Sequence, residues 1–222
     1  MSAMATEDTA PASAGRRERK KQLTREALTE AAFELFAAKG FEATTVEEIA
    51  DAVDVSSRTF FRYFASKEDV ALTFQEEQLA AVLAALAARP AEEPVVTALR
   101  RAIVGIAEAC EEGELGFDPS RFQCIQAMMS SSPALMARSL EHSQKKQADL
   151  TRVIADRMGT DPAVDLRPHV VAAMGACCFR AVADMWESCP QPYTKLSAAV
   201  DEAFSLIEEG INFPSVNKPA HE

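Results

Sequence analysis

The sequence lacks the patterns that identify most membrane proteins, secreted proteins and enzymes. No apolar run in its 222 residues looks long enough to span a bilayer. The first 15 residues have no basic start followed by an apolar core, so we expect no secretory signal there. There is no Gly-rich phosphate loop, no G-x-S-x-G and no H-x-x-x-H motif, and the three histidines lie far apart. We therefore predict a cytoplasmic protein that is not an enzyme and needs no cofactor.

The cysteines form no recognisable metal or disulfide pattern. Their number, five, is odd, and their spacing fits no zinc motif. In a reducing cytoplasm we expect free and mostly buried thiols with no metal bound. The adjacent pair Cys177 and Cys178 leaves a second interpretation open, in which the chain senses oxidants or metals through these thiols. We favour the simpler interpretation that both are small residues packed between helices.

Helical spacing of apolar residues dominates the chain. These residues recur at i, i+3 and i+4, and no hairpin dipeptide such as Asn-Gly occurs, so we predict an all-α fold. Leu28 and Phe36 share one face of the first expected helix, which Gly40 ends. Thr45 is the expected N-cap of the second helix, with Glu48 placed to complete a capping box. The expected helices cover residues 22–39, 46–53, 57–63, 66–90, 95–111, 119–130, 133–158, 167–188 and 193–209.

The first three expected helices have a helix-turn-helix layout. A long helix precedes two short ones, and only Asp54, Val55 and Ser56 separate the short pair. We expect an N-terminal three-helix helix-turn-helix DNA-binding domain and a larger helical ligand-binding and dimerisation domain. The expected boundaries are a disordered tail at 1–15, the DNA-binding domain at 16–67, the regulatory and dimerisation domain at 68–214 and a tail at 215–222.

Charge is unevenly distributed along the chain. The formal net charge of −11 argues against nucleic-acid binding over the whole surface. Residues 16–67, however, carry ten basic and nine acidic side chains, whereas the rest of the chain carries 13 basic and 25 acidic ones. The basic run RRERKK at 16–21 lies just before the first expected helix. We interpret it as an arm that reaches a DNA backbone or minor groove, with a solvated tail as the alternative.

The segment SSRTFFRYF at 56–64 concentrates arginines and aromatics in an acidic chain. If it is helical, Phe60 and Phe64 lie four residues apart and face the stripes of the first two helices. The alternative, a short core helix with incidental arginines, does not account for the neighbouring capped helices and the turn. The opposite face carries Ser57, Arg58, Phe61 and Arg62, with Thr59 and Tyr63 on its flanks.

These side chains suit a DNA major groove. Arginine can bond guanine O6 and N7 in a bidentate way, and apolar carbon can contact a thymine methyl. Hydroxyl groups and helix N-termini bind phosphates. Thr45 and Lys67 each lie at an expected helix N-terminus, where backbone N–H groups attract an anion. The segment therefore predicts a DNA-binding surface.

The quoted motifs resemble the N-terminal domain of the TetR (tetracycline-repressor-like) family of transcriptional regulators. The resemblance covers about fifty residues, through F-x-x-K-G-F-x-x-T-T-V-x-x-I-A, V-S-x-x-T-F-F-R-Y-F and S-K-E. It implies that the third helix enters the major groove. Two departures are Arg58, where the family often has Gly, and Phe61, where it often has Tyr and hence a hydroxyl donor. The resemblance implies DNA contacts at Thr45, Ser57, Thr59, Phe61, Tyr63 and Lys67.

The larger domain carries no comparable motif. The family resemblance implies that it dimerises through its last two long helices and holds an inducer between the middle ones. Residues 167–188 are apolar around most of the expected helix, which a second subunit would help to bury. In 193–209, Leu196, Val200, Phe204 and Ile207 form one stripe.

Four residues are candidates for ligand binding, with core packing and a paired structural charge as the alternative. Phe122, Gln126 and Met129 share a face of the 119–130 helix, where methionine suits an adaptable apolar cavity. Arg180 interrupts an apolar helix and needs a carboxylate or an acidic ligand as a partner. We expect a small apolar or amphipathic effector.

Together these features predict a homodimeric, sequence-specific DNA-binding repressor that a small molecule releases from a palindromic operator in double-stranded DNA. Besides the thiol sensor, one rival is an interaction module on the same fold that does not bind DNA. Another is a small-molecule enzyme built on that scaffold. The sequence does not distinguish repression from activation.

Overall fold

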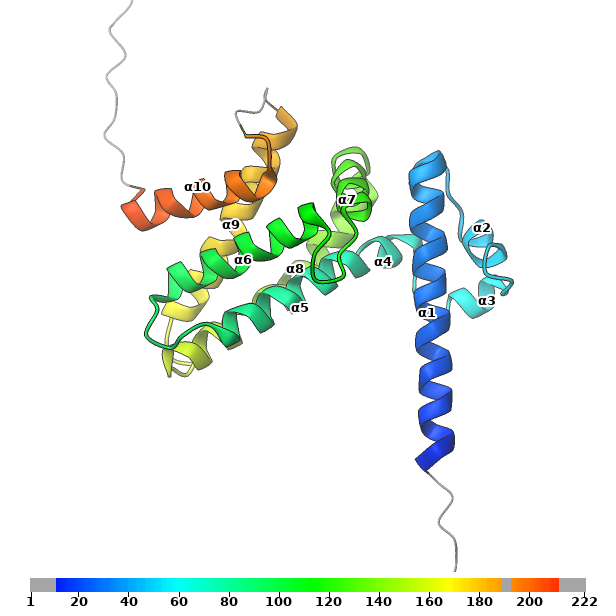
Figure 1. Ribbon diagram of the computed structural model, residues 1–222, viewed down its shortest axis with the longest axis horizontal. Helices are drawn as coiled ribbons and strands as arrows, with labels where there is room; N and C mark the ends of the chain where they lie inside the picture. Colours follow the sequence, from blue (N-terminus) through cyan, green and yellow to red (C-terminus); the bar gives the residue numbers. More distant parts are fainter. Residues whose placement is uncertain (1–10, 189–192, 212–222) are drawn as a thin grey trace, which may run out of the picture. The chain divides into compact units, whose positions relative to one another are not determined.

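The computed structural model describes residues 11–188 and 193–211, and every regular element in these ranges is an α-helix (Figure 1). This confirms the all-α fold that the apolar spacing predicts. The helices are α1 Pro11–Lys39, α2 Val46–Asp51, α3 Ser57–Phe60, α4 Lys67–Ala71, α5 Thr73–Ala88, α6 Val95–Glu112, α7 Pro119–Ser131, α8 Pro133–Met158, α9 Arg167–Ser188 and α10 Leu196–Glu209.

The chain divides into two compact units. The first unit comprises Met1–Thr73 and Cys124–Arg138, and the second comprises Phe74–Gln123 and Ser139–Glu222. We expected one boundary after residue 67. The structure differs because α7 and α8 each contribute residues to both units, so that the corner between these helices belongs to the first unit.

Helix α1 begins earlier than expected. It starts at Pro11 instead of near residue 22, so residues 11–15 are helical and not a tail. Proline is tolerated in the first helical turn, and the run of arginine, lysine and glutamate that follows has high helix propensity. The basic residues at 17–21 are exposed, and the first part of α1 extends beyond α2 and α3 in Figure 1. Residues 1–10 of the expected N-terminal tail and the tail expected at 215–222 lie outside the described residues.

The core of the first unit joins its N-terminal helices. Leu28 of α1, Ile49 of α2, Phe60 of α3 and Val70 of α4 are all fully buried. Phe36 lies at the end of the α1 stripe, and its ring centroid is 5.0 Å from that of Phe41 in the following turn. Burial of such side chains contributes about 1.5–3 kcal/mol each. The apolar stripes predicted for the first two helices therefore lie where we expected them.

In the second unit, α6 packs against α9 and α10, and α9 packs against α10. The expected stripe of α10 is buried at Leu196, Val200 and Phe204. On α9, a side chain at Gly175 would place its Cβ only 2.9 Å from Leu99 Cδ2, so glycine permits the close approach of α6. Val170 on the same helix is 53% exposed, which leaves an apolar part of α9 uncovered in a single subunit.

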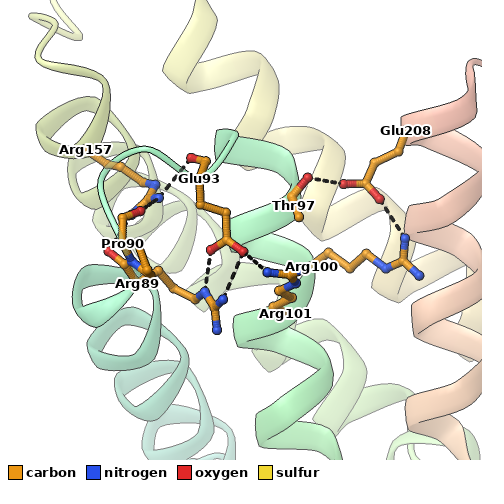
Figure 2. A network of polar contacts seen from close by, with 8 residues as sticks. All are labelled: Arg89, Pro90, Glu93, Thr97, Arg100, Arg101, Arg157 and Glu208. Atoms are coloured by element: carbon orange, nitrogen blue, oxygen red, sulfur yellow. Dashed lines mark hydrogen bonds and ion pairs between the residues drawn. The ribbon is translucent and has the colours of Figure 1, made fainter.

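A polar network fixes the loop between α5 and α6 (Figure 2). The Glu93 carboxylate accepts hydrogen bonds from Arg89, with an Nη2–Oε1 distance of 2.9 Å, and from Arg101. Arg157, near the end of α8, donates to the carbonyl oxygens of Arg89, Pro90 and Glu93. Arg157 therefore supplies donors to the backbone carbonyl groups of the loop that follows α5.

A second part of this network joins α6 to α10. Arg100 binds the Asp201 carboxylate through Nε and Nη2, at 2.7 and 2.8 Å, and donates to Glu208 through Nη1 at 2.6 Å. Thr97 also donates to Glu208 (Figure 2). Two-point binding by arginine holds one geometry, so these contacts set the register of the two helices.

One stretch, residues 67–88, is long and apolar enough to cross a membrane by length and composition alone. The core helices of globular proteins pass the same test. We expected no run of this length. Val70, Leu72, Phe74 and Leu86 are at most 2% exposed, while 39% of the apolar window as a whole is buried inside the protein.

Candidate nucleic-acid interface

The helix-turn-helix begins with a capped α2. The Thr45 hydroxyl accepts a hydrogen bond from the Glu48 backbone N–H at 3.3 Å, and the Thr45 N–H donates to Glu48 Oε2 at 2.9 Å. These two bonds form the predicted capping box. A hydrogen bond from Lys39 and the bonds from Thr45 lower the pKa of Glu48 to about 2. Glu48 therefore stays ionised and ties the end of α1 to the start of α2.

A tight turn connects α2 to α3. Asp54 has a φ of 53°, in the left-handed region that aspartate tolerates better than most residues. The Val55 N–H returns to the Ala50 carbonyl at 3.0 Å. Ser56 then caps α3, since its Oγ accepts from the Thr59 N–H at 3.2 Å. The turn and the Thr45 cap lie where the sequence predicts them.

Helix α3 is shorter than expected, but its facial division is the predicted one. It ends at Phe60 rather than near residue 63, and backbone bonds from Tyr63 and Phe64 to the Phe60 carbonyl continue the coil as a turn. Phe60 and Phe64 are 0% and 4% exposed, and their rings lie 5.7 Å apart. They anchor the segment in the first unit.

The other face of this segment is open to solvent. Arg58 and Arg62 are exposed, and Phe61 is 55% exposed, a high value for so large an apolar side chain. Ser57 is half-buried at the start of α3. An exposed ring between two guanidinium groups fits a surface that contacts a partner more readily than one that serves solubility.

Two flanking residues have partners within the protein. The Thr59 hydroxyl lies 3.1 Å from the Ser56 hydroxyl. Arg62 lies over the Tyr63 ring, with Cζ 5.4 Å from the centroid, and Nη2 donates to the Tyr63 hydroxyl at 3.3 Å. Burial raises the pKa of Tyr63, but hydrogen bonds with Thr24 and Arg62 and nearby positive charge leave it below its ordinary value.

Lys67 is placed differently from our expectation. Its ammonium donates to the carbonyl oxygens of Phe41 at 2.8 Å, Thr44 at 3.0 Å and Glu42 at 3.3 Å. It also lies 4.5 Å from the centroid of the Phe41 ring. An ammonium has three donors, so these carbonyls occupy all of them. The side chain closes the turn between α1 and α2, and a phosphate would have to compete with these bonds.

The corner between α7 and α8 forms hydrogen bonds to the turn after α1 and to α4. Ser132, which is 1% exposed, donates through Oγ to Glu42 Oε1 at 2.5 Å. Arg138 donates to Asp69 of α4 through Nε at 2.7 Å and Nη2 at 3.2 Å. Leu135 between them is fully buried. Sequence reasoning missed these contacts, because neither Ser132 between the two helices nor Arg138 in α8 stands out from its local sequence.

The four candidate ligand residues differ in burial and in the unit to which they belong. Phe122 is buried, and its ring lies 6.4 Å from that of Phe74 in the second unit. Gln126 and Met129 are half-buried but belong to the first unit, beyond the division after Gln123. Arg180, for which we expected a carboxylate or an acidic ligand as partner, is exposed on α9. The helix presents it on a face that neighbouring helices do not cover.

The thiol pair shows little sign of activation. Cys177 is exposed and Cys178 is buried. Burial, and to a smaller degree the neighbouring Cys177, raise the pKa of the Cys178 thiol, which lowers its thiolate fraction. In the part of the chain that the structure describes, no three His, Cys, Asp or Glu side chains are grouped to hold a metal ion.

Two family models match the chain. The model of bacterial regulatory proteins of the tetR family matches residues 28–73, and the model of the MftR C-terminal domain matches residues 93–212. The chain is 41% identical over 177 residues to the HTH-type transcriptional regulator TcmR of Streptomyces glaucescens, covering 79% of this chain and 78% of TcmR. It is 26% identical over 194 residues to MftR of Mycobacterium tuberculosis, covering 87% and 94% of the two chains.

A solved structure shares the fold. FadR of Thermus thermophilus, a TetR-family repressor crystallised with lauroyl-CoA, has a TM-score of 0.56 at 23% identity, over 89% of this chain and all of that one. The capped helix-turn-helix, the two family models that cover both parts of the chain and the similarity to TcmR agree. The chain belongs to the TetR family of bacterial regulatory proteins and is a DNA-binding transcriptional regulator.

Proposed function

We propose that α3 enters the major groove of double-stranded DNA and that Arg58 reads a base there. One observation carries this proposal: Phe60 and Phe64 are buried as an anchor, while Arg58 is exposed on the opposite face. A bidentate contact between arginine and guanine contributes about 1–3 kcal/mol of discrimination. Glycine is common at this position in the family, so Arg58 would give this chain a preference of its own.

The other exposed residues suit positioning contacts. The Phe61 ring can contact a thymine methyl or the sugar backbone, although it lacks the hydroxyl that a tyrosine would offer a phosphate. Arg62 is held over Tyr63 and presents positive charge beside the groove-facing surface. Ser57, at the start of α3, lies where backbone N–H groups favour phosphate. Thr45 would have to exchange its bonds to the Glu48 carboxylate for a phosphate.

Two predicted contacts take an indirect role in this proposal. The Thr59 hydroxyl is already shared with Ser56, and the Lys67 ammonium is occupied by three carbonyl oxygens. We assign both to positioning α2 and α3. The helical extension of α1 presents the exposed basic residues 17–21, which would reach the DNA backbone as a rigid element instead of a flexible arm.

We further propose that the regulator acts as a homodimer on a palindromic operator. Exposed apolar side chains on the last two helices support this arrangement, including Val170 and Phe179 of α9 and Leu206 of α10. A two-fold dimer places two copies of α3 on half-sites about one helical turn or somewhat more apart.

We also propose that a small apolar or amphipathic effector binds the second unit and releases a repressor from its operator. Membership of the TetR family supports this role, and FadR of Thermus thermophilus, crystallised with lauroyl-CoA, is a precedent with the same fold. Differential binding of this kind typically couples two sites by about 1–3 kcal/mol. The proposed regulator works in the cytoplasm, where its operator is, and it carries out no catalysis.

Selection from a pool of randomised double-stranded DNA tests the DNA-reading role. The full-length wild-type chain should enrich a palindromic sequence, and Arg58→Ala should enrich one with a relaxed position in each half-site. Enrichment of no sequence by the wild type would refute the proposal. The same relaxed positions in both proteins would exclude Arg58 as the base reader.

A further inference from the structure

Helix α8 faces the interior of the second unit with an unusual row of side chains. Positions Leu150 and Ile154 are buried and apolar, as expected for a helix that packs against others. The same line continues toward the start of the helix through Ser139, His142 and Lys146, which are polar and half-buried. A packed seam between helices normally requires apolar residues at such positions. The polar row is therefore a feature that packing alone does not explain.

The polar row meets polar partners on α5. Gln75 Oε1 accepts hydrogen bonds from Lys146 Nζ at 2.7 Å and from the Ser139 hydroxyl at 3.2 Å. His142 Nδ1 lies 3.9 Å from Glu76 Oε1. One amide oxygen thus accepts from two donors that lie seven residues, about two turns, apart on α8. These contacts converge on one place in the unit.

The charge of Lys146 is incompletely balanced there. Burial lowers the pKa of its ammonium, an effect that the charge of Glu76 partly offsets. The Glu76 side chain is itself 52% exposed, so solvent screens it. Within the described residues, the one hydrogen-bond acceptor on the ammonium is the neutral amide of Gln75. A partly desolvated cation gains most from an anion that shares its environment.

An aromatic cluster begins at the residue that precedes Gln75 on α5. Phe74 precedes Gln75 on α5, is 2% exposed, and has the Phe117 ring at 5.8 Å and the Phe122 ring at 6.4 Å. One turn further along α5, Gln78 donates to the buried thiol of Cys110 at 3.2 Å. A few convergent polar groups beside aromatic side chains are the usual composition of a site for a small amphipathic molecule.

We infer that Lys146, with Ser139 and Gln75, binds the anionic group of an amphipathic effector, such as a carboxylate, phenolate or sulfonate, whose apolar body lies against the Phe74 side of the site. This inference rests on the proposed ligand-responsive function and names the chemical class of its effector. Phe122, a candidate from the sequence, contributes to the apolar side. Exposed Arg180 has no part in it.

Two dyes that share a ring skeleton, of which only one carries an anionic group, test the role of the anion in binding. 1-Anilinonaphthalene-8-sulfonate carries a sulfonate that N-phenyl-1-naphthylamine lacks. The full-length protein should bind the sulfonate dye more tightly by about tenfold, as expected for one charge-assisted hydrogen bond. Lys146→Gln should reduce this preference to less than about twofold, whereas Lys146→Arg should retain most of it. Fluorescence titration gives both dissociation constants.

Lys145→Gln is the matched control, because it removes the same charge from the exposed neighbour of Lys146. It should leave the preference for the sulfonate dye unchanged. An equal loss of the sulfonate preference in both glutamine variants would show that it depends on long-range charge, and this result would overturn the inferred site. Equal binding of the two dyes by the wild type, or no binding of either, would overturn it as well.

Operator binding separates this inference from the proposed function. Both glutamine variants should bind the selected operator as the wild type does, since neither lysine belongs to the first unit. Sequence-specific operator binding without a dye preference would disprove the anion site alone. Failure of the wild type to recognise any operator would instead disprove the regulatory function.

Discussion

Lys67 Nζ lies 2.8 Å from the carbonyl oxygen of Phe41 and 3.0 Å from that of Thr44. The first residue of α4 therefore closes the turn that leads from α1 into α2. A side chain at a helix N-terminus in this motif looks from sequence like a phosphate ligand. In the structure it holds the turn from which α2 begins, as part of the helix-turn-helix.

Replacement of Lys67 by methionine tests this role. It leaves three carbonyl oxygens without their donor, so the free energy of unfolding should fall by about 1–3 kcal/mol. Operator affinity should fall with it, while the slope of log affinity against log salt stays that of the wild type. A phosphate contact would instead reduce that slope by about one unit and leave stability nearly unchanged. Chemical denaturation and binding titrations at several salt concentrations decide between the two.

Arg58→Ala should separate specific from non-specific binding. The exposed side chain makes no packing contribution, so the melting temperature should hardly change. Affinity for the selected operator should fall by about 1–3 kcal/mol, while affinity for random DNA falls little. Arg62→Ala provides the comparison, since a backbone contact would weaken both kinds of DNA alike. Equal losses on both DNAs for Arg58→Ala would assign it to the backbone as well.

The contact between Arg138 and Asp69 should influence DNA binding without touching DNA. It connects the start of α8 to α4 within the first unit, close to the turn that Lys67 closes. A double-mutant cycle with Arg138→Gln and Asp69→Asn should give a coupling energy of about 0.5–3 kcal/mol in stability. Operator affinity should fall in each single variant. Additive effects on stability, or unchanged affinity, would show that the pair does not position the reading unit.

The local features of the helix-turn-helix in the first unit were predictable from sequence, because they depend on residues three or four positions apart. The Thr45–Glu48 capping box and the Phe60–Phe64 anchor are of this kind. The contact of Ser132 with Glu42 spans 90 residues, and that of Lys67 with Phe41 spans 26. A helical pattern identifies which face is polar but not which distant group that face meets. Contacts at such separations therefore required the folded structure.

The candidate ligand residues also show that the sequence does not predict which side chains distant helices bring together. Apolar neighbours in the sequence indicated that Arg180 needs an acidic partner, and the structure places this side chain on an exposed part of α9. Lys146 lies in a helix with many charged residues, so the sequence alone does not distinguish it from an exposed lysine. Its half-buried position becomes apparent only when α5 supplies Gln75 as a neighbour.

Glu48→Gln should change how stability depends on pH. The pKa of Glu48 is about 2 in the folded protein, below its ordinary value of 4.5, because Lys39 and Thr45 hydrogen-bond to the ionised form. The stabilisation is therefore complete above pH 4.5 and is lost as the pH falls through the folded pKa. In Glu48→Gln, the free energy of unfolding should lose part of its pH dependence between pH 4.5 and 2, measured by urea denaturation. Glu47→Gln, at an exposed neighbour outside the capping box, should retain the wild-type dependence. An identical pH dependence in the two variants would mean that the bonds around Glu48 do not stabilise the start of α2.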